Sequence, residues 1–297
     1  MLLQFKRAFL CGILICSTLC GFSEDNSVFK HIFWTPAALA SGSPCLFTVA
    51  FQSAPSALEG EWFGRKVEFF PSNDKTSWHA LAGADVETNP GIYSLTLHAI
   101  FSDGTKEDTT RDIRVEPARY KQVELQVPEN FVSPDAATLK RIAEEKEIKD
   151  KAFAQSASLP LWRGNFEPPL NSPATDSFGT RRIFNGKLAS VHRGMDFRAK
   201  AGTPVHAVNA GRVILARNLF YEGNCVVIDH GQQFMTIYMH LSKILVKEGE
   251  PVQTHQLLGL SGATGRATGP HLHLAVRWQG AYLDPAILFT MKLSGVR

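Results

Sequence analysis

The chain has 297 residues, of which 44% are hydrophobic and 20% are charged. This ordinary globular composition excludes a collagen, a coiled-coil rod and a disordered chain, and the length allows about two domains of typical size. The formal net charge of +3 is too small to indicate a protein that binds nucleic acid by neutralising phosphates.

Residues 1–23 have the pattern of a secretory signal peptide. Two basic residues near the start precede an uncharged, mostly apolar run, which is shorter than the roughly 20 residues that a spanning helix needs. The small residues Gly21 and Ser23 predict cleavage before Glu24; an uncleaved amino-terminal anchor is the alternative. We therefore expect an exported protein, periplasmic or associated with the cell envelope, with no stable membrane span after cleavage.

Cleavage would leave two cysteines, Cys45 and Cys225. Two cysteines are far from a disulfide-dense scaffold. The sequence leaves open whether they form a bridge outside the cytoplasm or remain as buried free thiols.

Residues 24–118 predict an Ig-like β-sandwich. Short runs with strand composition alternate with turn-forming clusters of glycine, proline, serine and asparagine. The runs lie at residues 46–49, 66–70, 93–97 and 112–115. This region shows no cluster of catalytic residue types.

Residues 119–157 predict a helical connector. Ser133 and Pro134 match a capping hydroxyl followed by proline at the first helical position, and the helix is expected from Ala136 to about Gln155. Its lysines and glutamates indicate a largely solvated face. Such a helix could hold the two domains apart or lie across the second one.

In the carboxy-terminal region, from residue 158 onward, two local patterns suggest a metal site. His192 and Asp196 supply an imidazole and a carboxylate, and Gly194 between them favours a turn that brings both to one point. His271 and His273 stand two apart in a run of strand composition, so both imidazoles face one side of a sheet.

Two histidines and one aspartate form the ligand set of a catalytic zinc site, which leaves a fourth position for water. No His-Glu-x-x-His pattern occurs, so a glutamate base of that metalloprotease type is absent. The histidines that do not bind the metal, His240 and His271, have a near-neutral pKa in water that suits general acid and base chemistry. His230, which follows Asp229 and precedes Gly231, is interpreted as a structural residue.

Over roughly residues 160–290 the sequence resembles the lysostaphin-type (LytM-type) zinc endopeptidases that cut peptidoglycan cross-links. The resemblance is carried by segments in the family's order and spacing: 177–181, 192–197, 202–205, 211–213, 223–224, 229–231, 238–241, 262–265 and 269–273. It implies that residues 158–297 form an antiparallel β-sheet peptidase domain with an open groove over the metal.

The resemblance also implies a role for each site residue. His192, Asp196 and His273 would bind one Zn2+ per chain, and His271 and His240 would flank the water that zinc activates. The substrate would be a stem or cross-bridge peptide of peptidoglycan. D-Ala–diaminopimelate and Gly–Gly links both occur in the family's substrates, and the sequence does not select between them. The amino-terminal region could inhibit or target the enzyme.

Two other functions remain open at this point. The chain could be a non-catalytic, zinc-containing wall-binding protein or amidase activator, or a zinc peptidase for glycine-rich protein substrates. We expect a mostly β protein that hydrolyses peptidoglycan cross-links through a zinc-activated water.

Overall fold

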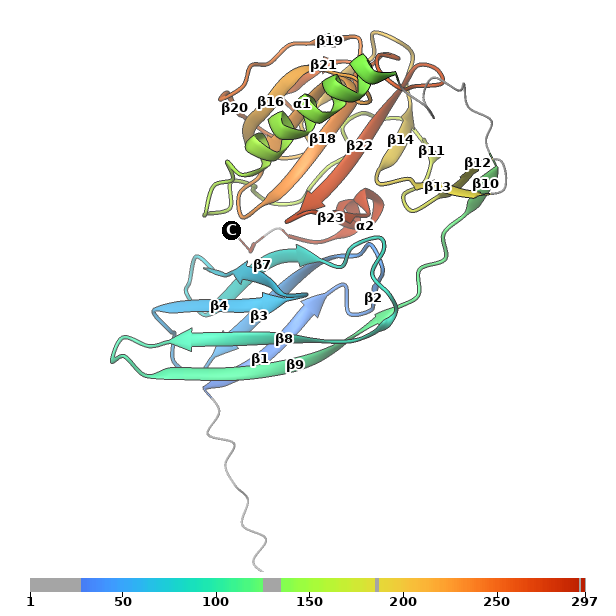
Figure 1. Cartoon of the computed structure of the whole chain (residues 1–297). Helices are drawn as coiled ribbons and strands as arrows, with labels where there is room; N and C mark the ends of the chain where they lie inside the picture. Colours follow the sequence, from blue (N-terminus) through green and yellow to red (C-terminus); the bar gives the residue numbers. More distant parts are fainter. Residues whose placement is uncertain (1–27, 125–134, 185–186, 294, 297) are drawn as a thin grey trace, which may run out of the picture.

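The computed structural model describes residues 28–124, 135–184, 187–293 and 295–296. The expected signal peptide lies outside these residues. The chain forms an amino-terminal β-sandwich and a carboxy-terminal β-domain that pack against each other, with helix α1 (Ala136–Phe153) lying across the second (Figure 1). The expected mostly β fold is confirmed. In the part of the chain that the structure describes, neither helix combines the length and apolarity needed to cross a bilayer.

The sandwich is built from two sheets whose inner faces interdigitate. Phe47 and Trp62 come from opposite sheets, and their rings meet edge to face with centroids 5.5 Å apart; both side chains are fully buried. One sheet, in spatial order, contains β1 (Phe29–Thr35), β3 (Pro44–Phe51), β7 (Ser77–Gly83) and β6 (Phe70–Pro71). The other contains β2 (Leu39–Ala40), β9 (Lys106–Glu116), β8 (Gly91–Ile100), β4 (Ala57–Trp62) and β5 (Arg65–Glu68).

All four strand-like runs expected in this region fall within or across these strands. The run at 66–70 is divided, because β5 ends at Glu68 and β6 begins at Phe70 in the other sheet. Cys45 and Cys225 are free thiols, and both are buried. The disulfide alternative is therefore wrong, and these thiols act as small apolar core residues.

The carboxy-terminal domain centres on one large antiparallel sheet. Its strands, in spatial order, are β11 (Ala174–Asp176), β14 (Met195–Arg198), β22 (His271–Trp278), β18 (Phe234–Leu241), β17 (Gly223–Asp229), β16 (Gly211–Leu219) and β20 (Pro251–Val252), with β23 (Ala281–Leu283) beside β22. Smaller sheets join β15 (Pro204–His206), β21 (Leu257–Leu260) and β19 (Lys243–Ile244), and β10 (Gln122–Glu124), β12 (Arg181–Phe184) and β13 (Lys187–Val191). The short helix α2 (Pro285–Thr290) follows β23.

Strand β22 has two distinct faces. Its even-numbered residues, from Leu272 to Trp278, are buried in the main core of the molecule. The odd-numbered residues point to the opposite face, where Ala275 packs in a cluster with Ala152 of α1. Because side chains alternate along a strand, His271 and His273 lie on this same face of β22, the face that α1 covers farther along the sheet.

The connector contributes a strand and a helix to the carboxy-terminal domain. Strand β10 pairs in parallel with β12 of the carboxy-terminal domain. Helix α1 begins after Asp135, whose carboxylate accepts a hydrogen bond of 2.7 Å from the backbone N–H of Thr138. The cap is therefore Asp135, because its carboxylate is the side chain that reaches the first turn; Ser133 and Pro134, expected as cap and first helical residue, lie outside the described residues.

The two domains share a polar seam. The Asp85 carboxylate accepts a 2.7 Å hydrogen bond from the backbone N–H of Tyr282, and the Gln279 side chain donates one of 2.6 Å to the carbonyl of Lys66. These contacts join the sandwich to β23 and to the turn before it. The amino-terminal domain is thus attached to the sheet that carries the histidine pair.

His230 is a buried structural residue. Its Nδ1 donates to the carbonyl of Ala210 at 2.7 Å, and its Nε2 lies 2.8 Å from the hydroxyl of Thr236. Burial lowers the pKa of His230 to about 4. The unfolded chain therefore binds more protons than the folded chain between about pH 6.5 and pH 4.

We expect this histidine to make the folded protein acid-sensitive. As the pH falls from 7 to 4, His230 should remove about 3 kcal/mol from the free energy of unfolding. Urea denaturation at both pH values should show a smaller difference for His230→Gln than for the wild type. The exposed His255 serves as the control: His255→Gln should keep the wild-type difference. An unchanged pH difference in His230→Gln would contradict the assignment.

Candidate metal centre

Asp196 is placed by strand β14. Its neighbours Met195 and Phe197 are buried in the core, so alternation turns the Asp196 carboxylate to the opposite face. Asp196 pairs directly with His273 of β22, and Arg198 pairs with His271. The register therefore sets a carboxylate beside the imidazole expected to share a metal with it.

Gly194 lets His192 approach this pair. A Cβ atom at residue 194 would collide with the His273 ring and would lie 2.5 Å from the carbonyl oxygen of Leu274. A side chain cannot be accommodated there without moving the strand. The sequence pattern His-x-Gly-x-Asp thus has a steric reason as well as a conformational one.

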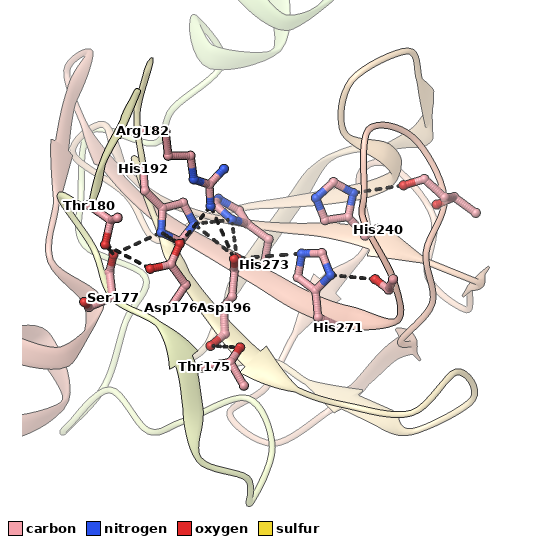
Figure 2. A network of polar contacts seen from close by, with 12 residues as sticks. Thr175, Asp176, Ser177, Thr180, Arg182, His192, Asp196, His240, His271 and His273 are labelled. Carbon is pink, nitrogen blue, oxygen red and sulfur yellow. Dashed lines mark hydrogen bonds and ion pairs between the residues drawn. The ribbon is translucent and has the colours of Figure 1, made fainter. Parts of the chain in front are cut away.

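The three side chains converge (Figure 2). Nε2 of His192 lies 3.1 Å from Oδ1 of Asp196 and 3.0 Å from Nδ1 of His273, and the last two atoms are 2.8 Å apart. A tetrahedral ion with bonds of about 2.1 Å separates its donor atoms by about 3.4 Å. The donor atoms fit such an ion after moving outward by a few tenths of an ångström, and the nitrogen and oxygen donors are the type that zinc accepts.

The ring of His192 is oriented by contacts to Nδ1, the ring nitrogen that faces away from the metal group. Its Nδ1 donates to the carbonyl of Ser177 at 3.0 Å, so the lone pair of Nε2 is left for the centre. Oδ2 of Asp176 also lies 3.4 Å from this Nδ1. Partners of this kind fix the tautomer and the direction of a metal-binding histidine.

Arg182 joins two carboxylates at the edge of the site. Its guanidinium donates to Asp176 at 2.9 Å and lies 3.6 Å from Oδ2 of Asp196. Burial opposes ionisation of Asp176 and is the largest single influence, but Arg182, His192 and Thr180 together outweigh it and keep the pKa of Asp176 below its usual value. Arg182 thus engages the outer oxygen of Asp196, while Oδ1 faces the two histidines.

The carboxyl of Asp196 remains ionised. Burial alone would raise its pKa, but the close polar contacts with His192 and His273 hold the pKa well below the usual range. Burial is also the main reason why the pKa of His273 is lowered. The lowered pKa values favour the carboxylate form of Asp196 and the neutral imidazole form of His273, which are the forms that bind a cation.

His240 and His271 lie next to this group (Figure 2). The centroids of their rings are 4.8 Å apart. Nδ1 of His240 donates to the carbonyl of Thr264 at 2.9 Å, and Nδ1 of His271 donates to the carbonyl of Gly269 at 2.8 Å. Each Nε2 is therefore free to accept a proton. Nε2 of His271 is 3.8 Å from Oδ1 of Asp196, which places it at the edge of the metal group.

His240 is held in an unfavourable backbone conformation. Its φ of 63° is in the left-handed region, and the pairing of β17 with β18 changes register between Val226 and Asn224, opposite this residue. Such bulges redirect a side chain, and such strain is concentrated at functional sites. Burial, together with the neighbouring His273, lowers the pKa of His240 to about 4, so its ring is neutral at physiological pH.

The structure brings all five expected site residues together. The sequence alone did not identify the residues that orient them through hydrogen bonds and ion pairs. Asp176 and Arg182 flank the 177–181 motif on either side, and this adjacency was the only available signal. Thr264 lies in the glycine-rich loop and contacts His240 through its backbone carbonyl. Any residue type offers that carbonyl, so the threonine side chain did not indicate a role at the site.

Comparison with known proteins places this site in a family. The family model described as peptidase family M23 matches residues 190–285. Peptidoglycan DD-endopeptidase ShyA of Vibrio cholerae is 48% identical over 125 residues, which are 41% of this chain and 26% of that protein. Peptidoglycan DD-endopeptidase ShyB of the same species is 41% identical over 127 residues, 43% of this chain and 26% of that protein. The chain thus matches about a quarter of the length of these relatives.

A solved structure resembles a larger part of the chain. The crystal structure of a Pseudomonas aeruginosa protein assigned to peptidase M23 superposes with a TM-score of 0.62 and is 31% identical in sequence. The match covers 84% of this chain and 94% of that one. The similarity therefore extends beyond the metal-site domain into the amino-terminal part.

Proposed function

The chain belongs to peptidase family M23, and from this premise we propose that it is an exported zinc endopeptidase that hydrolyses peptide cross-links of peptidoglycan. The observation that supports this most is the convergence of His192, Asp196 and His273 within 4.8 Å of one another, with two further histidines at the edge. The matched relatives named as peptidoglycan DD-endopeptidases support the substrate class.

In this proposal His192, Asp196 and His273 hold one zinc ion per chain. Zinc, when bound, polarises the scissile carbonyl and makes water acidic enough to attack at neutral pH. Nε2 of His271 takes the proton of the attacking water. Nε2 of His240 carries no proton in the neutral ring, so it would stabilise the developing negative charge or deliver a proton to the leaving amine only after it has taken one up.

The proposal assigns the role of general base to His271 because of the position of its ring. Its Nε2 lies 3.8 Å from Oδ1 of Asp196. Among the described residues, His240 makes no hydrogen bond or ion pair with the metal group, and its ring centroid is 6.1 Å from that of His273. The carbonyls of Gly269 and Thr264 hold the Nδ1 protons of both rings in place. The two rings can therefore exchange protons at Nε2 without reorientation.

The amino-terminal region is proposed to restrict access to this site. Helix α1 lies over β16 and β18 (Figure 1). It packs on the face of the large sheet from which the histidine pair also projects. Substrate would then approach between the helix and the metal group. The signal peptide expected in residues 1–23 supports export and an envelope location.

The direct test is mass spectrometry of purified sacculi after incubation with the zinc-loaded protein. We expect cross-linked fragments to be converted to monomers, the conversion to stop with a chelator, and added zinc to restore it. A glycine-rich peptide digested in parallel distinguishes a protein substrate. Zinc-bound protein that leaves both materials intact would instead support a non-catalytic wall-binding or activator role.

A further inference from the structure

A cavity of about 240 Å³ lies between α1 and the large sheet. Its floor is formed by strands β16, β17, β18 and β22, and one wall by the side of α1 that includes Lys149 and Phe153. Arg277 of β22 lines it and has the same parity as His273, so both side chains leave the same face of the strand. The cavity thus opens on the face that carries the metal group.

The cavity is adjacent to the metal group. Met239 lines the cavity and is the direct cross-strand partner of His273. Glu222, at the same end, lines the cavity and accepts the backbone N–H of His240 on its carbonyl at 2.9 Å. The end of the cavity at Met239 and Glu222 therefore lies next to His240 and His273.

Two buried polar atoms in the cavity lining have no partner among the described residues. They are Nη1 of Arg277 and Oε2 of Glu222. Each is removed from solvent, and a buried donor or acceptor without a hydrogen bond is destabilising, so few are found in folded proteins. One is a donor at the far end, and the other is an acceptor at the metal end. Their positions give the cavity a polarity.

The charges of the lining balance except at Arg277. Lys146 pairs with Asp150 at 2.5 Å, and Lys149 pairs with Glu222 at 2.5 Å. No carboxylate of the described residues lies within ion-pair distance of Arg277, whose guanidinium rests on the ring of Phe153, 4.2 Å from its centroid. One anionic group of a bound ligand would neutralise the remaining positive charge of Arg277.

We propose that this cavity is a substrate subsite in which Arg277 binds a free carboxylate of the peptide and Glu222 accepts an N–H nearer the scissile bond. The proposal rests on the proposed function, and it names the substrate class: cross-linked peptides that carry a free carboxyl group, such as those built on diaminopimelate. A bridge made only of glycine offers no such group.

The spacing along β22 indicates which part of the substrate Arg277 binds. Arg277 is four residues from His273, about 13 Å at the rise of an extended strand. The long arginine side chain reaches back over part of this distance. The carboxylate should therefore belong to a residue two or three positions from the bond that is cut.

The test uses the zinc-loaded full chain and synthetic cross-linked peptides. Each free carboxyl group is converted to the amide in turn, and kcat and KM are measured for each acid–amide pair. At one position the wild type should prefer the acid by about 10- to 100-fold in kcat/KM, since a hydrogen bond between charged groups is lost in the amide. Arg277→Gln should lower this preference to near unity, mainly through KM, and Arg277→Lys should keep much of it.

Two matched variants separate substrate binding from support of the helix. Phe153→Leu loosens α1 but keeps the positive charge of Arg277. It should therefore change kcat/KM for the acid and the amide of a pair by the same factor. Arg212→Gln, an exposed arginine on β16, should leave the rates unchanged. A wild type without acid preference at any position, or Arg277→Gln with an intact preference, would overturn the subsite. Failure to cleave any of the peptides would count against the proposed function instead.

Discussion

The His273→Ala variant is expected to lose both its bound zinc and its hydrolytic activity. Nδ1 of His273 lies 3.0 Å from Nε2 of His192 and 2.8 Å from Oδ1 of Asp196, so its removal leaves two of three protein donors. A catalytic zinc site needs three protein ligands with one position open to water. Metal analysis after dialysis should find zinc at one equivalent in the wild type and far less in the variant.

The matching His271→Ala variant should retain zinc and lose turnover. His271 lies on the same strand and face, but its Nδ1 is held by the carbonyl of Gly269 and its Nε2 is at the edge of the metal group. Loss of a general acid or base lowers rates by about 10²- to 10⁴-fold. If His271→Ala cleaves sacculi at the wild-type rate, or loses zinc as His273→Ala does, the assignment of roles is wrong.

A second large effect is expected from Gly194→Ala. The added Cβ would meet the ring of His273 and the Leu274 carbonyl at 2.5 Å, so the ring must move away from Asp196. Displacement of a ligand by a neighbouring group weakens metal affinity by about 10- to 100-fold. Competition with a chromogenic chelator would measure the change in the zinc dissociation constant.

The control is Gly269→Ala, in the loop that leads to β22. A Cβ atom at Gly269 would have no neighbour within 4 Å, so zinc affinity should be close to that of the wild type. Equal affinities for Gly194→Ala and the wild type, with both proteins folded by circular dichroism, would show that the site tolerates the crowding.

Local residue patterns predicted the ligand group because its chemistry is encoded over short distances. His271 and His273 share a face through strand alternation, and His192 and Asp196 are joined by a glycine that permits close approach. The strands of the sandwich were predictable for the same reason, since period-two patterning and turn residues act over a few positions.

Other features depend on contacts between distant segments, and the sequence did not reveal them. The sequence left open whether the charged helix α1 holds the domains apart or lies across the second one, and only the structure shows that Ala152 and Phe153 pack against the large sheet. Arg277 is 124 residues from Phe153 in the chain, and its role depends on that packing. The capping carboxylate of Asp135 was missed because Ser133 and Pro134 formed an equally plausible local signal.

The pairing of β10 with β12 has a consequence for how the protein can be divided. A fragment starting at residue 158 would lose β10, and the backbone groups of β12 that face it would become an unprotected edge that recruits other chains. It would also lose the ring of Tyr120, which covers Gly179 beside the loop that orients His192. Soluble, metal-competent fragments should therefore keep Tyr120 and β10, and gene fusions are best joined ahead of the sandwich, because a cut inside it would expose further strand edges.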